Sequence, residues 1–130
     1  MKTIAALLTT LLLVGLASAQ ASPPSVTLSW TESTTVTAPT TLYFTVYRFA
    51  PTAGACVLPS SPTVLFANVT ATTAQDTSVV RGTSYCYVLT ASTVTNGEVM
   101  TSGFSNIAGP ATPPILTAPN PPTTIILVVQ

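Results

Sequence analysis

The sequence of 130 residues has no histidine and very little charge. Only 5% of its residues are charged, against about 25% in an average soluble domain, and its three acids are Glu32, Asp76 and Glu98. Without histidine there is no Ser-His dyad and no usual metal site. A glycosidase needs two carboxyl groups about 5 to 10 Å apart, whereas these three acids lie in different segments. We therefore expect no enzymatic activity and no cofactor.

Basic residues are equally scarce, because Lys2 is the only lysine and Arg48 and Arg81 are the only arginines. So few cations cannot neutralise a row of phosphates, which argues against nucleic acid and anionic membrane surfaces as partners. Solubility must then depend on serine and threonine hydroxyl groups. Such a surface has little self-repulsion to keep copies of the chain apart.

The first twenty residues have the organisation of a secretory signal peptide. Lys2 precedes an apolar run over residues 4–16, and the small residues Ala-Ser-Ala follow at 17–19, so we expect cleavage before Gln20. The alternative is an uncleaved membrane anchor, but the run is shorter than the roughly 18 to 20 apolar residues that cross a bilayer. We predict a secreted chain, extracellular or periplasmic, with no membrane insertion after cleavage.

The sequence has two cysteines, Cys56 and Cys86, and export would place them in an oxidising compartment. We predict a disulfide between them. Closing a loop of about 31 residues stabilises a fold by roughly 3 to 4 kcal/mol in the entropic account. The alternative is two free, buried thiols, and metal binding by two cysteines without histidine is less favoured still.

The local signals are those of β-strands. The chain is rich in Thr, Val, Tyr and Phe, is punctuated by proline and glycine, and shows no helical periodicity after the signal peptide. We expect an all-β fold, with strands at residues 26–31, 42–49, 63–69, 71–80, 83–94 and 99–104. Asn96-Gly97 predicts a hairpin turn before the last of these.

Alternation along the strands predicts which side chains face the core. The inward residues are expected to be Val26, Leu28, Trp30, Phe44, Val46, Tyr85, Tyr87, Leu89 and Ala91. Asp76 is expected to cap a turn, with a surface ion pair to Arg81 of little energetic weight.

These segments together resemble a bacterial fibronectin type III domain over about residues 25–112. The resemblance is carried, in order, by VTLSWT, FTVYR, DTSVVRGTSYCYVLTA, NGE and SN. It implies a two-sheet Greek-key β-sandwich of about seven strands, immunoglobulin-like, of a kind used for adhesion and for protein or carbohydrate contact. It also implies a core position for Trp30 and a tyrosine corner at Tyr85. No particular ligand follows from it, because the fold hosts many functions.

One part of the family's pattern is displaced. The family's opening strand precedes VTLSW by about ten residues, but cleavage would leave only residues 20–24 there. A segment of that kind stands instead at the far end, with the apolar residues Ile125, Ile126, Leu127, Val128 and Val129. We therefore divide the chain into a signal peptide (1–19), a fibronectin type III-like domain (20–112), a proline-rich linker (113–122) and a C-terminal strand (123–130).

A sandwich without its first strand exposes unpaired backbone groups along one edge, which invites strand addition. The chain between Gly109 and Pro122, about 14 residues, can reach about 43 Å in polyproline form. That exceeds the roughly 30 Å length of a sandwich built of strands of eight or nine residues. Residues 123–130 could pair with their own domain, complete a neighbouring copy, or form a disordered tail.

Three functions are compatible with these features. The first is a non-enzymatic secreted module for adhesion or for binding extracellular protein or carbohydrate, through loops at 33–39, 51–62 and 95–98 or through Tyr43 and Tyr47. The second is a structural subunit whose partners are copies of itself, assembled head to tail by exchange of the C-terminal strand. The third is an accessory module for an enzyme on another chain.

Overall fold

The computed structural model describes residues 21–32 and 36–117. The predicted signal peptide and the predicted C-terminal strand lie outside these residues. The described chain forms seven strands and no helix. They are β1 (Val26–Ser29), β2 (Thr41–Phe49), β3 (Thr63–Val69), β4 (Thr73–Asp76), β5 (Tyr85–Thr95), β6 (Glu98–Thr101) and β7 (Ala108–Ala111). Accordingly, no helix in this part of the chain is long and apolar enough to cross a membrane.

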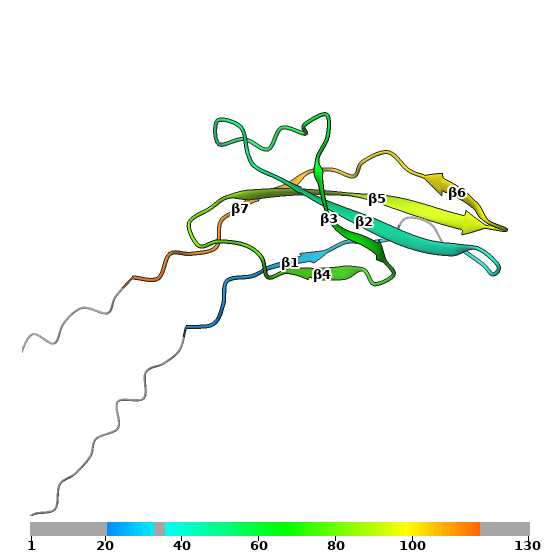
Figure 1. Ribbon diagram of the computed structural model, residues 1–130, viewed down its shortest axis with the longest axis horizontal. Helices are drawn as coiled ribbons and strands as arrows, with labels where there is room; N and C mark the ends of the chain where they lie inside the picture. Colours follow the sequence, from blue (N-terminus) through cyan, green and yellow to red (C-terminus); the bar gives the residue numbers. More distant parts are fainter. Residues whose placement is uncertain (1–20, 33–35, 118–130) are drawn as a thin grey trace, which may run out of the picture.

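The strands form two antiparallel sheets. The small sheet contains β1 and β4, and the large sheet has the order β3-β2-β5-β6, with β7 pairing the other end of β5. Figure 1 shows the small sheet lying against one side of the large one. The all-β class is therefore confirmed, and the two sheets are consistent with a β-sandwich.

The centre of the large sheet is the ladder between β2 and β5. Nine residue pairs extend from Thr41↔Val94 to Phe49↔Cys86 without a register shift. Both strands are rich in Thr, Val and aromatic residues, which fit a pleated, half-buried surface. These strands and β3 lie close to their predicted bounds, whereas the strand expected at 71–80 is shortened to β4.

The hairpin predicted at Asn96-Gly97 is confirmed between β5 and β6. Asn96 has φ 51° and Gly97 has φ 87°, so both central residues are left-handed, as a type I′ turn requires. The strand expected at 99–104 ends early, at Thr101, and β7 follows after an interruption. β7 was not expected, because Gly109 and Pro110 are both poor strand formers.

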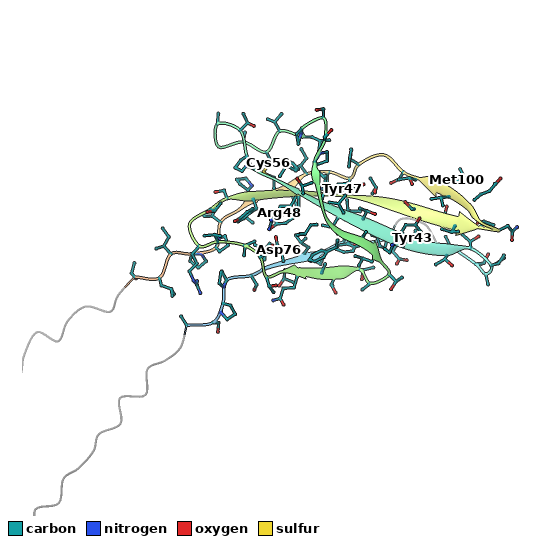
Figure 2. The ribbon with its side chains drawn as sticks, in the orientation of Figure 1. Tyr43, Tyr47, Arg48, Cys56, Asp76 and Met100 are labelled. Carbon is teal, nitrogen blue, oxygen red and sulfur yellow. A yellow bond between two sulfur atoms is a disulfide. The ribbon has the colours of Figure 1, made fainter. Side chains whose placement is uncertain are left out.

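The predicted disulfide between Cys56 and Cys86 is confirmed, with a Cα–Cα distance of 5.8 Å. It holds the loop at 51–62 against the outer face of the large sheet, where Cys56 and Leu58 pack on Phe49 and Val88. Cys56 is labelled on this loop in Figure 2.

Phe44 and Val46 are buried, as predicted, with 3% and 1% of their surface exposed. For β5 the prediction is wrong in part. Of the four residues expected on its buried face only Tyr87 is buried, whereas the opposite face buries Cys86, Val88, Thr90 and Ser92. The disulfide-linked loop covers Cys86 and Val88 on the outer face, the Ser92 hydroxyl is hydrogen-bonded to Thr101 of β6, and the small sheet covers only part of the inner face.

Both described ends of the chain lie at the same end of the sandwich (Figure 1). The Arg81 guanidinium donates to the backbone carbonyls of Ser22 and Pro114, and the Gly82 amide donates to the carbonyl of Pro113 at 2.8 Å. The expected ion pair between Arg81 and Asp76 is therefore wrong. Asp76 is instead buried and binds Arg48 of β2, which lies far away in the sequence but directly across the interface between the sheets.

Candidate functional site

The strand β1 pairs on one side only within the described chain. The Trp30 amide donates to the carbonyl of Thr72 at 3.0 Å, in register with the ladder between β1 and β4. Hydrogen-bonded positions alternate in an antiparallel pair, so the backbone groups of Thr27 and Ser29 point away from β4. These groups form an open edge that another strand can pair with.

The inner face of β5 lies partly uncovered beside this edge. Leu89 and Ala91 pair with Val46 and Phe44 of β2 and share their face, which is the face toward the small sheet. Over residues 21–32 and 36–117 the small sheet has two strands of four residues each, which cannot cover the whole length of β5. Leu89 and Ala91 consequently remain half-buried.

This uncovered surface forms a groove between the edge of β1 and the chain segment at 100–108. The groove consists of two hollows of about 380 and 440 Å³, which share Thr31, Leu89 and Ser105. Along β5 it runs from Tyr87 to Thr93, or about 20 Å at the rise of a β-strand. We call it the β1 groove.

Trp30 lies in the wall of the β1 groove. Its ring packs edge-to-face on Phe44, with centroids 5.4 Å apart. Its Nε1 atom is buried, and no hydrogen-bond partner for it is found in the described part of the chain. Buried donors nearly always have a partner, and leaving one unpaired costs about 1 to 3 kcal/mol.

The rim opposite β1 is apolar and exposed. Met100 and Phe104 line this rim and expose 75% and 44% of their surfaces, and Met100 is labelled at the β6 end in Figure 2. Among the residues that line the two hollows, Glu32 is the one with a charged side chain. The groove therefore offers hydrophobic contact and backbone hydrogen bonds rather than charge complementarity.

Two serines produce the interruption between β6 and β7. The amides of Leu89 and Ala91 donate to the side-chain hydroxyls of Ser105 and Ser102, at 3.1 and 3.0 Å. The serine amides return backbone bonds to the carbonyls of the same two residues. Because hydroxyls replace two carbonyl acceptors, the segment at 102–105 departs from a regular strand along the rim of the β1 groove.

A polar cluster holds the two sheets together beside the β1 groove. The Asp76 carboxylate accepts hydrogen bonds from Arg48 Nη1 (2.8 Å), from the Ser78 hydroxyl (2.7 Å) and amide (2.9 Å), and from the Tyr87 hydroxyl (3.1 Å). Arg48 and Asp76 face each other between the sheets in Figure 2. Each of these hydrogen bonds joins groups within the fold, so we assign the cluster a structural role.

Comparison of the chain with models of known families, with curated proteins and with solved structures found no match. The resemblance to fibronectin type III domains therefore rests on the residues alone and stays a prediction. Trp30 packs between the sheets on Phe44, and the Val80 amide donates to the Tyr85 hydroxyl at 3.0 Å, across the turn that precedes β5.

The other residues considered from the sequence do not converge on a site. Tyr43 and Tyr47 are half-buried rather than exposed, and the Tyr47 ring packs edge-to-face on Phe104 at 5.3 Å. Asp76 is buried in the polar cluster, whereas Glu32 and Glu98 are exposed. Over residues 21–32 and 36–117, no group of three or more His, Cys, Asp or Glu side chains could hold a metal ion.

The β1 groove itself was only partly foreseeable. The missing opening strand indicated a free edge, but neither the interruption at 102–105 nor the uncovered face of β5 has a clear signal in the sequence. The closest signal is the repetition of serine in Ser-Gly-Phe-Ser, where strand-forming residues would otherwise continue the hairpin.

Proposed function

We propose that the chain is an exported, non-enzymatic module, organised like a fibronectin type III sandwich, that binds extracellular protein by accepting an extended strand into the β1 groove. The observation that carries this proposal is the uncovered apolar face of β5 beside the outward-pointing backbone groups of Thr27 and Ser29.

Strand addition needs two features, and the groove supplies both. Backbone hydrogen bonds to a free edge provide affinity, and hollows for alternate side chains provide specificity. The edge of β1 provides the first, and the two adjoining hollows provide the second. An added strand would cover Leu89 and Ala91, which the small sheet leaves half-buried.

The geometry favours protein over carbohydrate as the ligand. The two tyrosines that could have stacked on a sugar are half-buried, and Tyr47 already packs against Phe104. The groove has an apolar floor and backbone groups along one wall, which suit a peptide better than a polyhydroxylated ring.

A peptide-binding experiment tests the proposal on the secreted chain, residues 20–130. The probe is a synthetic peptide of alternating valine and threonine with a lysine at each end. We expect it to slow hydrogen exchange at the Thr27 and Ser29 amides and to shift the emission of Trp30, the only tryptophan.

Ser29→Pro supplies a matched variant. Its ring removes an amide that points away from β4, so the ladder between β1 and β4 is retained. We expect Ser29→Pro to weaken peptide binding about tenfold, through one lost hydrogen bond and the bulk of the ring, and Ser29→Ala to bind normally. Equal binding by both variants, or no protection of β1, would contradict the proposal.

A further inference from the structure

We infer that the strand accepted by the β1 groove is residues 123–130 of a second copy of the chain, so that copies join head to tail. The inference rests on the proposed function and names the partner of the same groove.

The chemistry of this segment matches the groove. Residues 123–130 read Thr-Thr-Ile-Ile-Leu-Val-Val-Gln, with five consecutive apolar residues, four of them β-branched, and no charge. Eight extended residues span about 26 Å, enough to fill a groove of about 20 Å. An acidic strand would find no complementary charge there, and a basic strand would find Glu32 alone among the lining side chains.

The place where the described chain ends limits which copy can receive the strand. Pro113 is buried, and Arg81 and Gly82 hold the carbonyls of Pro114 and Pro113. The chain is thus attached to the sandwich as far as Pro114, close to where β1 begins. This leaves residues 115–122 as the spacer, shorter than the 14 residues assumed from the sequence.

The spacer favours a neighbouring copy over the parent domain. A strand antiparallel to β1 must start beside Thr31, about 20 Å along the groove, and then turn back toward the start of β1. Eight spacer residues reach about 26 Å when fully extended, so crossing the groove would leave almost none for that reversal. Pro119, Pro121 and Pro122 lie within this spacer, and residues before proline prefer extended backbone. A second copy can take the strand without any reversal.

The resulting contact is heterologous, because the donated strand and the accepting groove are different surfaces. Such contacts propagate into filaments unless their rotation closes a ring. The few charges on the chain provide little repulsion between copies.

Sedimentation velocity of the secreted chain over a concentration series gives the first test. We expect the average mass to rise with concentration. Leu127→Pro removes a backbone amide from the donated strand, and Ser29→Pro removes one from the accepting edge. Each variant alone is expected to associate about tenfold more weakly. Glu98→Ala, at an exposed residue outside both the groove and the donated strand, is expected to assemble like the parent.

Mixing the two proline variants gives the decisive result. Leu127→Pro has an intact groove and Ser29→Pro has an intact strand, so we expect the mixture to form one-to-one dimers that grow no further. A mixture that stays monomeric overturns the inference. The inference is also overturned if the parent is monomeric and Leu127→Pro lowers its free energy of unfolding, because that result indicates pairing within one chain.

The valine-threonine peptide separates this inference from the proposed function. If the chain binds the peptide but its copies never associate, the proposed function stands, and only the inference that residues 123–130 of a second copy fill the groove is overturned. If the chain does not bind the peptide, and its association is the same in Ser29→Pro as in the parent, both the proposed function and this inference are overturned.

Discussion

The Arg48 guanidinium donates to the Asp76 carboxylate at 2.8 Å and thereby joins the two sheets. Arg48 belongs to β2 of the large sheet and Asp76 to β4 of the small one. The Asp76 side chain is 1% exposed and that of Arg48 is 28% exposed. The small sheet has few residues to bury, so this polar contact matters more here than in a larger sandwich.

Removal of the Asp76 carboxylate should destabilise the fold. We expect Asp76→Ala to lower the free energy of unfolding by about 3 kcal/mol, because Arg48 and the Tyr87 hydroxyl lose a buried partner. Urea unfolding measures the change. The exposed Glu98→Ala is the control and should stay within about 0.5 kcal/mol of the parent. A loss of similar size in both variants would show that the cluster has no special role.

Stability should fall in acid. Burial raises the pKa of Asp76, but the hydrogen bonds from Ser78, Arg48 and Tyr87 together outweigh it and hold this pKa below its ordinary value. Because the folded-state pKa is the lower one, the contribution is present above about pH 4 and is lost as the pH falls through the folded pKa. Urea unfolding at a series of acidic pH values should show this loss, and Asp76→Asn should flatten it. An unchanged acid profile in Asp76→Asn would place the titrating group elsewhere.

The disulfide should contribute a large share of the stability. Cys56 and Cys86 are 30 residues apart, and closing such a loop constrains the unfolded chain by about 3 to 4 kcal/mol. We expect the double variant Cys56→Ser, Cys86→Ser to lose about this much in urea unfolding. A reducing agent should destabilise the parent to a similar extent and leave the double variant unaffected, and any other pattern would contradict the prediction.

Gly109 should resist substitution. A Cβ atom there would lie 2.8 Å from the Tyr85 carbonyl oxygen, and its φ of 114° is a conformation that other residues rarely adopt. We expect Gly109→Ala to cost about 2 kcal/mol and to loosen β7 from β5. Gly103→Ala is the matched control, since a Cβ there meets nothing within 4 Å. Thermal unfolding compares the two, and equal midpoints would contradict the prediction.

The Tyr85 hydroxyl should stabilise the turn before β5. It accepts the Val80 amide at 3.0 Å, and the Arg48 guanidinium lies 5.0 Å from the centre of its ring. Tyr85→Phe keeps the ring and removes the hydrogen bond, so we expect a loss of about 1 kcal/mol. Faster hydrogen exchange at the Val80 amide would report the same change locally. Unchanged exchange there would argue against a tyrosine corner.

Strands with strong periodicity could be predicted from the sequence, and those set by tertiary contacts could not. β2 and β3 alternate or carry many β-branched residues, so local preference and final structure agree. β7 contains Gly109 and Pro110, and only its pairing with β5 makes it a strand. The disulfide was predictable because a chain with the pattern of a signal peptide and two cysteines leaves few alternatives.

Misassigned partners have a common physical cause. Nearness in the sequence predicts Arg81 as the partner of Asp76, but the packing of the two sheets brings Arg48 to it from the other sheet. Burial on β5 was assigned to the face toward the small sheet, which would hold for two sheets of equal width. The narrow small sheet reverses that expectation and exposes the β1 groove.

The contacts of the two arginines have a consequence for resistance to proteases. Lys2 lies in the predicted signal peptide, so the secreted chain would contain only Arg48 and Arg81 as cleavage points for trypsin-like proteases. Arg48 is bound to Asp76 between the sheets, and Arg81 is bound to the carbonyls of Ser22 and Pro114. Proteases cut flexible, accessible segments, whereas Arg48 lies within β2 and Arg81 lies in a turn that its two hydrogen bonds tie to both ends of the described chain. Scarcity of charge thus removes nearly all such cleavage points, and folding protects the two that are left.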